Sequence, residues 1–370
     1  MELTVAPLAD LGPSTTVLLP VRYHRRPPVL LDLADMEAPY RQELDVAFAQ
    51  LTEDAPAVTY HALADATVVG QGTVVTADRR IVHEAAYEFL RPGNVPDGLE
   101  RAGDGFRLKP ATEVVVERPS LLAKRPWAQN FGHFLIDAAA LVTLADRLGL
   151  PSGWQIIITR FANARLRATA HEVMAVLAPG VTVVEHPDDE AWRVRRLHYL
   201  SPIQRPPITK RPEPLAMLRA ALLRRYRDRP GGMRRIFVSR GPGIGRSLVN
   251  EDAIVALCMA HGFQVVHPGL DPIDEQAALF RQASLVVGVK GAALTNLLFG
   301  TAGATALVLT PSDFPDPFFW DLSAHAGMGY AEMAGRRTAD LPRGQNSFTI
   351  DPDRFAALLD ALILRGDVVP

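Results

Sequence analysis

The chain has 370 residues, a length that favours two domains over one. Hydrophobic residues make up 48% of the chain and charged residues 22%, so a disordered or fibrous protein is excluded. With 39 Lys and Arg against 41 Asp and Glu, the net charge of -2 argues against a protein that coats nucleic acid or an anionic membrane. Cys258 is the single cysteine, which excludes an intramolecular disulfide and favours a reducing compartment.

The first 20 residues contain acidic residues and a proline and lack the basic and apolar regions of a signal peptide. No uncharged apolar run reaches the roughly 18 residues that a transmembrane helix needs. A cytoplasmic location is therefore expected.

Residues 1–200 are predicted to form an N-terminal domain that is rich in β-strands up to about residue 125 and α/β from there on. Short β-like runs lie at 16–20, 66–76 and 112–119, separated by Pro, Gly and Asp clusters. Apolar residues at three- and four-residue spacing predict a helix of about five turns over 130–148. Strands at 154–159 and 181–186 then flank a helix at 164–180, which predicts a parallel sheet.

Residues 201–233 are predicted to be a linker followed by a helix. The first part, 201–214, is too rich in proline for a regular element, and the helix is expected over 215–228. Between Arg195 and Arg246, fourteen Arg or Lys face only Glu213 and Asp228. A nucleic-acid interface is the simplest alternative explanation of this basic stretch, but it lacks interleaved aromatic residues for base stacking.

Residues 234–340 are predicted to form a second, Rossmann-like domain, because strands and helices alternate with short connections. The expected strands lie at 234–240, 263–268, 284–289 and 305–310, and the helices at 250–262, 274–283 and 291–300. The remaining residues, 341–370, form a tail with an amphipathic helix from an Asp351 N-cap to Gly366.

Asn130, His133 and Asp137 are the first candidate site. Their spacing of three and four residues stacks them on one face of the predicted helix. A carboxylate or imidazole placed in this way can serve as a general base. The alternative is an ordinary helix start, with Asn130 as N-cap and the other two side chains in solvent.

The glycine-rich segment 239–246 is the second candidate. Arg240 and Arg246 present guanidinium groups suited to phosphate around a flexible loop that contains Gly243, although a mobile loop with solvated arginines has equal weight. The glycine spacing differs from the dinucleotide fingerprint, which disfavours an NAD-dependent oxidoreductase. Asn250 is expected to be the N-cap of the next helix, with Glu251 in its first turn.

The third candidate is GVKGAALTN at 288–296, which runs from a strand into a helix. Lys290 adds a charge near the helix N-terminus, and Gly291 and Ala292 are small enough for an anionic ligand to approach. Tight packing of the helix on the sheet is the alternative explanation.

In their order along the chain, these motifs resemble glycosyltransferase family 61 of the bacterial type. The resemblance rests on Asn130, His133 and Asp137, on R-x5-R-x3-NE from Arg240 to Glu251, on Glu275-Gln276, and on the segment from Lys290 to Asn296. It implies a GT-B fold: two Rossmann-like domains with parallel sheets facing a cleft, 1–200 on the acceptor side and 234–340 binding the nucleotide-sugar.

The resemblance further implies an inverting hexosyl- or pentosyltransferase of polysaccharide biosynthesis that moves a sugar from a nucleotide-sugar, expected to be UDP-linked, to a saccharide hydroxyl. Asp137 is the first choice for the base, and His133 is the second. The donor's phosphates are expected to meet Arg240, Gly243, Arg246, Lys290, Gly291, Ala292 and Asn296. Asn130, Glu251, Glu275 and Gln276 are candidates for contacts with sugar or nucleotide.

Neither a metal nor a cofactor is expected, because cations take the place of a metal ion at the diphosphate. The family usually has histidine at the position of Lys290, and a lysine can neutralise phosphate only as a point charge. This departure supports the alternative of a catalytically inactive nucleotide-binding protein with the same fold. No nucleic-acid partner is expected, and the sequence is compatible with a homodimer.

Overall fold

The computed structural model describes residues 2–86, 90, 94–205, 209–224, 234–241 and 245–366. The chain forms two compact units, which are described separately. Unit 1 comprises residues 1–21, 55–205 and 213–221, and unit 2 comprises residues 22–54, 206–212 and 222–370. The segment 22–54 therefore belongs to unit 2, whereas the sequence analysis places it in the N-terminal domain.

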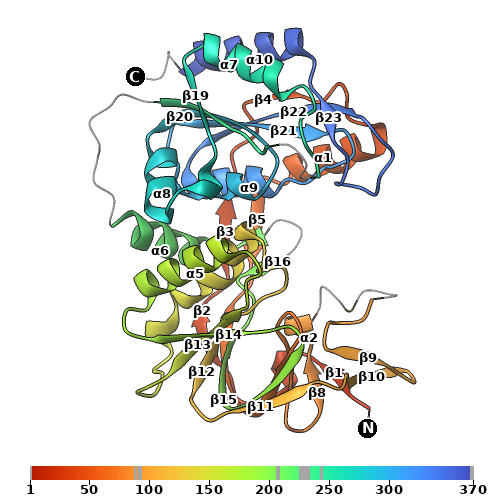
Figure 1. Ribbon diagram of the computed structural model, residues 1–370, viewed down its shortest axis with the longest axis vertical. Coiled ribbons are helices and arrows are strands. Elements are labelled where there is room, and N and C mark those ends of the chain that lie inside the picture. Colours follow the sequence, from red (N-terminus) through yellow and green to blue (C-terminus); the bar gives the residue numbers. More distant parts are fainter. Residues whose placement is uncertain are drawn as a thin grey trace. The chain divides into compact units, whose positions relative to one another are not determined.

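Unit 1 is built on a mixed ten-stranded sheet (Figure 1). Eight strands follow the order β1-β8-β7-β6-β15-β12-β13-β14, while β2 pairs with β6 and β11 with β15. A separate hairpin joins β9 and β10. The strands are β1 (Thr4–Ala6), β2 (Thr15–Leu18), β6 (Val58–Val69), β7 (Thr73–Val75), β8 (Arg80–Val82), β9 (Leu99–Ala102), β10 (Gly105–Leu108), β11 (Thr112–Val116), β12 (Ser120–Leu122), β13 (Gln155–Thr159), β14 (Thr182–His186) and β15 (Glu190–Leu200).

The strands predicted in unit 1 are confirmed as β2, β6 with β7, β11, β13 and β14. The parallel sheet expected from the strands at 154–159 and 181–186 is confirmed, because β13 pairs parallel with β14 and with β12. The whole sheet is mixed, because the long strand β15 pairs antiparallel with β6 while it is parallel to β11 and β12. Arginines interrupt the apolar pattern of β15, so no strand is predicted there. Arg193 pairs with Glu113 of β11, and Arg195 pairs with Asp65 of β6 and with Glu117, which directly follows β11.

The helix predicted over 130–148 is confirmed as a run of four helical segments that differ in their hydrogen bonding. These are α3 (Phe131–His133), the π-helical turn η3 (Phe134–Ala139), α4 (Ala140–Val142) and the 3-10 helix η4 (Ala145–Arg147). After α4, the Thr143 hydroxyl donates to the Ala140 carbonyl at 2.6 Å, which competes with helical bonding where the helix ends. The other helices of unit 1 are η1 (Leu8–Asp10), α2 (His83–Ala86), α5 (Ala164–Leu177) and α6 (Pro212–Leu223), the last of which begins in unit 2.

Unit 2 contains a doubly wound sheet in the order β19-β18-β20-β21-β22. All four neighbouring pairs are parallel, and β4 adds a parallel edge strand, whereas β23 is antiparallel. The strands are β4 (Leu30–Asp32), β18 (Arg234–Val238), β19 (Phe263–Val266), β20 (Ala283–Val289), β21 (Thr305–Pro311), β22 (Gly329–Arg337) and β23 (Phe348–Thr349). The four strands predicted in this domain are confirmed as β18 to β21. The short strands β3 (Val21–His24), β5 (Thr52–Ala55), β16 (Gln204–Arg205) and β17 (Thr209–Lys210) lie around the unit boundaries, so the expectation that 201–214 holds no regular element is wrong.

Helices cover both faces of this sheet. Figure 1 shows α7 and α10 on one face and α8 and α9 on the other. Ile254 and Cys258 of α7 join Phe355 and Leu359 of α10 in one buried core with the strands. The helices are α1 (Ala38–Ala49), α7 (Glu251–Ala260), η5 (Pro268–Leu270), α8 (Ile273–Arg281), the 3-10 helix η6 (Ala292–Phe299), α9 (Phe318–Ala326) and α10 (Pro352–Gly366). The predicted Asp351 N-cap is confirmed, since its Oδ1 accepts from the amides of Asp353 and Arg354.

Within the described segments, no helix combines the length and the apolar character needed to cross a bilayer.

Candidate functional site

His133 and Asp137 form a hydrogen-bonded pair in unit 1. His133 Nδ1 lies 2.9 Å from Asp137 Oδ2, and the side chains are 38% and 15% exposed. The π-helical turn begins directly after His133 and contains Asp137, and such turns are frequent at functional sites. The two side chains thus contact each other, and Asp137 is largely withdrawn from solvent.

The tautomer of His133 follows from this pair. An ionised carboxylate only accepts hydrogen bonds, so Nδ1 carries the proton and donates to Asp137. In the neutral ring, Nε2 is then the nitrogen that can accept a proton. The other carboxylate oxygen, Asp137 Oδ1, is buried and has no hydrogen-bond partner in the described part of the chain. Asp137 is thus placed to orient the imidazole, and His133 is the more accessible of the two groups.

Asn130 caps the helix on which this pair lies. Its side-chain Oδ1 accepts from the Gly132 amide at 2.8 Å, which confirms the N-cap expected from the sequence. Because the cap uses only Oδ1, the Nδ2 group can still donate to a ligand.

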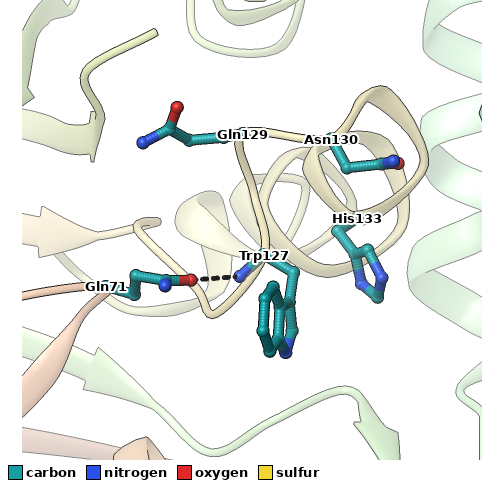
Figure 2. A pocket seen from close by; sticks show the side chains of 5 residues that line it. All are labelled: Gln71, Trp127, Gln129, Asn130 and His133. Carbon is teal, nitrogen blue, oxygen red and sulfur yellow. Dashed lines mark hydrogen bonds between the residues drawn. The ribbon is translucent and has the colours of Figure 1, made fainter. Parts of the chain in front are cut away.

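Two pockets meet at His133. The larger has a volume of about 430 Å³ and is lined by Gln71, Trp127, Gln129, Asn130 and His133 (Figure 2). The smaller, of about 40 Å³, shares Trp127 and His133 with it and adds the charged side chains of Glu84, Arg125 and Asp137. The imidazole therefore lies where an open pocket adjoins a narrow charged one.

Gln71 and Trp127 line the larger pocket but were not predicted from the sequence. Gln71 occupies the β6–β7 turn between Gly70 and Gly72, both of which have positive φ. A Cβ on Gly72 would come within 2.7 Å of the Lys124 carbonyl oxygen, so this glycine permits the close approach of the 124–127 segment. The available signals were the Gly-Gln-Gly turn and a tryptophan just before the Asn130 motif.

A second candidate site lies in unit 2, at the carboxyl ends of β18 and β20. The strand order makes the boundary between these strands the point where the winding direction reverses, and ligands of doubly wound sheets bind there. Arg240 follows β18 and Lys290 follows β20, and Arg240 Nη1 donates to the Lys290 carbonyl at 2.9 Å. The fold thus brings the second and third sequence motifs together.

Arg240 and Arg246 are both partly buried. Burial and the neighbouring charge of Arg246 lower the pKa of Arg240 to about 10. Burial also lowers the pKa of Arg246, against the attraction of Asp316 and Asp313, and its guanidinium lies 4.7 Å from the ring centre of Phe314. The Nε of Arg240 is buried and has no hydrogen-bond partner in the described segments. An anion between the two guanidinium groups would relieve their repulsion.

Lys290 does not contribute a free cation. Its side chain is fully buried, and its Nζ donates to Glu332 at 2.7 Å, to the Asp316 carbonyl at 2.9 Å and to the Phe314 carbonyl at 3.4 Å. The ammonium group has only three protons, so these acceptors occupy them all. In this structure Lys290 therefore has no proton left for the contact with a phosphate of the donor that was expected from the sequence.

Gly291 and Ala292 lead from β20 into η6, which is a 3-10 helix and not the expected α-helix. A Cβ on Gly291 would overlap Nη1 of Arg240, so the absence of a side chain makes room for that guanidinium. Gly243 lies outside the described residues.

Asn296 and Gln276 form a buried amide pair in which Asn296 Nδ2 donates to Gln276 Oε1 at 2.9 Å. Gln276 also donates to the Asp271 carbonyl, and Asn296 Oδ1 is buried and unpartnered in the described residues. Glu275 lies elsewhere, exposed on a hollow of about 380 Å³ lined by residues of β19 and α8. The structure therefore separates two residues that are adjacent in the sequence.

Glu251 and Asn250 anchor the loop that follows β18. Glu251 is in the first turn of α7, as expected, and accepts from the Ser239 hydroxyl. Asn250 is at the N-cap position, but its side chain bonds the backbone of Ile350 and does not cap the helix. The side chains of Glu251 and Asn250 are thus both engaged in contacts within the protein.

Among the described residues, no group of three His, Cys, Asp or Glu side chains could hold a metal ion.

The sheet order and its helices place unit 2 in the doubly wound α/β class. The family model described as Glycosyltransferase 61 matches residues 131–308, which include His133, Asp137, both arginines and Lys290. This segment, which is just under half of the chain, is thus similar to family 61, and the similarity indicates glycosyltransferase activity on sugar substrates. A search of curated proteins finds no match.

Proposed function

We propose that the protein is an inverting glycosyltransferase that moves a sugar from a nucleotide-sugar to a hydroxyl of a saccharide acceptor. The observation that carries this proposal is the His133–Asp137 pair, which lies on a pocket within the matched family segment. The proposal includes the two-domain GT-B arrangement and a donor of the UDP-linked type.

In the proposed mechanism, His133 Nε2 takes the proton of the acceptor hydroxyl as the oxygen attacks the anomeric carbon of the donor. Asp137 keeps the ring in the required tautomer and stabilises the imidazolium that forms, as carboxylates do in catalytic triads. This assignment reverses the order of preference expected from the sequence. It is supported by the burial of Asp137 Oδ1 and the greater exposure of His133.

The leaving nucleoside diphosphate gains negative charge as the bond to the sugar breaks. We assign its stabilisation to Arg240 and Arg246, which are partly buried and near enough for the charge of Arg246 to lower the pKa of Arg240. These cations make a metal-independent reaction the simplest expectation. The alternative of an inactive nucleotide-binding protein rested on the departure at Lys290, and the pairing of Lys290 with Glu332 accounts for that residue structurally.

The test compares Asp137→Asn with Asp146→Asn, an exposed carboxylate on the same helical stretch. A thermal-shift screen of nucleoside diphosphates first selects the donor class, because ligands that bind the folded state raise its stability. Transfer should fall about 100-fold or more in Asp137→Asn, since the asparagine amide favours the wrong imidazole tautomer, and donor affinity should stay unchanged. Asp146→Asn should behave as wild type.

The pH profile separates the two candidate bases. If His133 is the base, the acid limb of the pH profile should disappear in His133→Ala and remain in Asp137→Asn. Transfer in His133→Ala should then be partly restored by added imidazole. An Asp137→Asn variant with wild-type transfer would refute the proposal.

A further inference from the structure

Trp127 presents a large apolar ring to solvent at the edge of the 430 Å³ pocket. Its side chain is half exposed, whereas Trp320, for example, is fully buried. The backbone of Trp127 has φ +62°, a left-handed conformation that is unfavourable for a bulky residue. Strained backbone of this kind clusters at ligand sites.

The surrounding residues hold Trp127 in this conformation. Its backbone amide donates to Gln71 Oε1 at 2.9 Å, and Gln71 Nε2 in turn donates to Asp97 Oδ2 at 2.7 Å. On the other side, the Asn130 amide donates to the Trp127 carbonyl at 2.8 Å. The indole is therefore presented by a fixed loop, which reduces the conformational entropy lost on binding.

The pocket lining identifies the chemistry of its ligand. None of the five described lining residues is a carboxylate, lysine or arginine, so a charged ligand would find no counter-ion among them. The charged side chains of Glu84, Arg125 and Asp137 line the smaller pocket next to it. An indole face beside amide groups suits a ring with apolar C–H faces and hydroxyl groups at its edge, as in a neutral pyranose. The volume is within the range of about 300–1,000 Å³ that is typical of small-molecule sites.

The position of His133 determines which part of a bound ligand would face the imidazole. Figure 2 shows the rings of Trp127 and His133 on the same side of the segment that joins them, while the amide of Gln129 points to the opposite side. A sugar stacked on Trp127 would thus present an edge hydroxyl toward the imidazole. Asn130 Nδ2 can donate to a second hydroxyl of the same sugar, since the helix cap uses only the amide oxygen.

We propose that Trp127, with Asn130 beside it, forms a subsite for an uncharged sugar unit of the acceptor. The proposal rests on the proposed function, because it makes this sugar the group whose hydroxyl His133 deprotonates. It deepens that function by restricting the acceptor unit at this position to neutral saccharides, which excludes uronic and sialic acids.

The test measures saccharide binding without any donor. The full-length protein is labelled and applied to a glycan array that carries neutral and anionic oligosaccharides. We expect the wild type to bind neutral members, Trp127→Ala to lose at least tenfold in signal, and Trp127→Phe to recover most of it because the aromatic face remains. Trp154→Phe, a partly buried tryptophan of the same unit, is the matched control and should bind as wild type.

A second measurement needs no variant. Hydroxyl-radical labelling read by mass spectrometry should modify Trp127 in the free protein, and a neutral oligosaccharide retained on the array should protect it. This measurement decides the proposal if Trp127→Ala fails to fold.

Several outcomes would overturn the subsite. They are retention of anionic glycans only, no retention of any glycan, equal binding by Trp127→Ala, and no protection of Trp127. Loss of nucleoside diphosphate binding in Trp127→Ala would instead place the indole under the donor base. Because binding is measured without transfer, failure of the subsite is distinguishable from failure of the base, which only the Asp137→Asn and His133→Ala transfer assays report.

Discussion

Lys290→Met tests whether the buried cation of unit 2 stabilises the fold. The side chains of Lys290 and Glu332 are both fully buried, and their Nζ and Oε1 atoms are 2.7 Å apart. Tyr330 donates its hydroxyl to the second carboxylate oxygen at 2.5 Å. Methionine fills nearly the same volume as lysine but removes the charge, so the substitution leaves the Glu332 carboxylate buried without its cation.

The expected loss follows from this burial. Breaking a buried ion pair by removing one partner costs about 3–5 kcal/mol, whereas an exposed pair contributes at most about 1 kcal/mol. Burial raises the pKa of Glu332 above its ordinary value, and Lys290 opposes that rise. Without Lys290, Glu332 will bind a proton at higher pH, so the destabilisation should shrink as pH falls. The double variant Lys290→Met/Glu332→Gln removes both charges and should recover most of the loss.

Hydrogen exchange measured by mass spectrometry can localise the effect. Peptides from β20 and β22 should show a free energy of opening that is lower by about 3–5 kcal/mol in Lys290→Met. Peptides from β13 and β14, in unit 1, provide the internal reference. A loss below about 1 kcal/mol, or a double variant as unstable as the single one, would refute the reasoning. Unchanged nucleoside diphosphate affinity in the double variant would show that Lys290 does not contact the donor.

Three further predictions concern the phosphate site, the metal and pH. Arg246→Ala should weaken nucleoside diphosphate binding by about 1.5–3 kcal/mol in calorimetry, whereas the exposed Arg165→Ala should not. Transfer should persist in EDTA; a loss that Mg²⁺ or Mn²⁺ restores would contradict the assignment of charge stabilisation to arginines. Burial lowers the pKa of His186 to about 3, below the 6.5 or so of an unfolded chain, so stability should fall as pH drops below about 6.5, by up to about 1.4 kcal/mol per pH unit. Thermal melts of His186→Gln should show a shallower fall, and those of the exposed His83→Gln should not.

The sequence was most informative about unit 2, and the reason is hydrophobic patterning. β18 to β21 are continuous apolar runs because parallel strands covered by helices are buried on both faces. β22 escaped prediction because Glu332 interrupts its apolar run. A carboxylate in a strand usually indicates an exposed position, whereas Glu332 is buried because it pairs with the buried ammonium group of Lys290. The parallel pairing of β4 was equally hidden, since it brings residues 30–32 beside a strand about 300 residues later.

In unit 1, the polar face of the helix could be predicted from the sequence, but the residues around that face could not. The spacing of His133 and Asp137 was enough to expect their contact. Trp127 and Gln71 became visible only in the structure, because a hydrogen bond joins the 127 loop to a hairpin turn 56 residues earlier. The π-helical turn was also unpredictable, since the apolar spacing of three and four residues fits an ordinary α-helix as well.

Gly291 shows how a correct motif can have a different physical basis. The sequence suggested that small residues after β20 make room for a ligand, whereas the structure fills the space beside Gly291 with the guanidinium of Arg240. The glycine thus lets the two loops at the switch point come into contact. In this contact Arg240 Nη1 donates to the Lys290 carbonyl. Arg240 is thereby fixed in place with its Nε unpartnered among the described groups. A preorganised donor of this kind loses little entropy when an anion arrives, which is the property that stabilisation of a departing diphosphate requires.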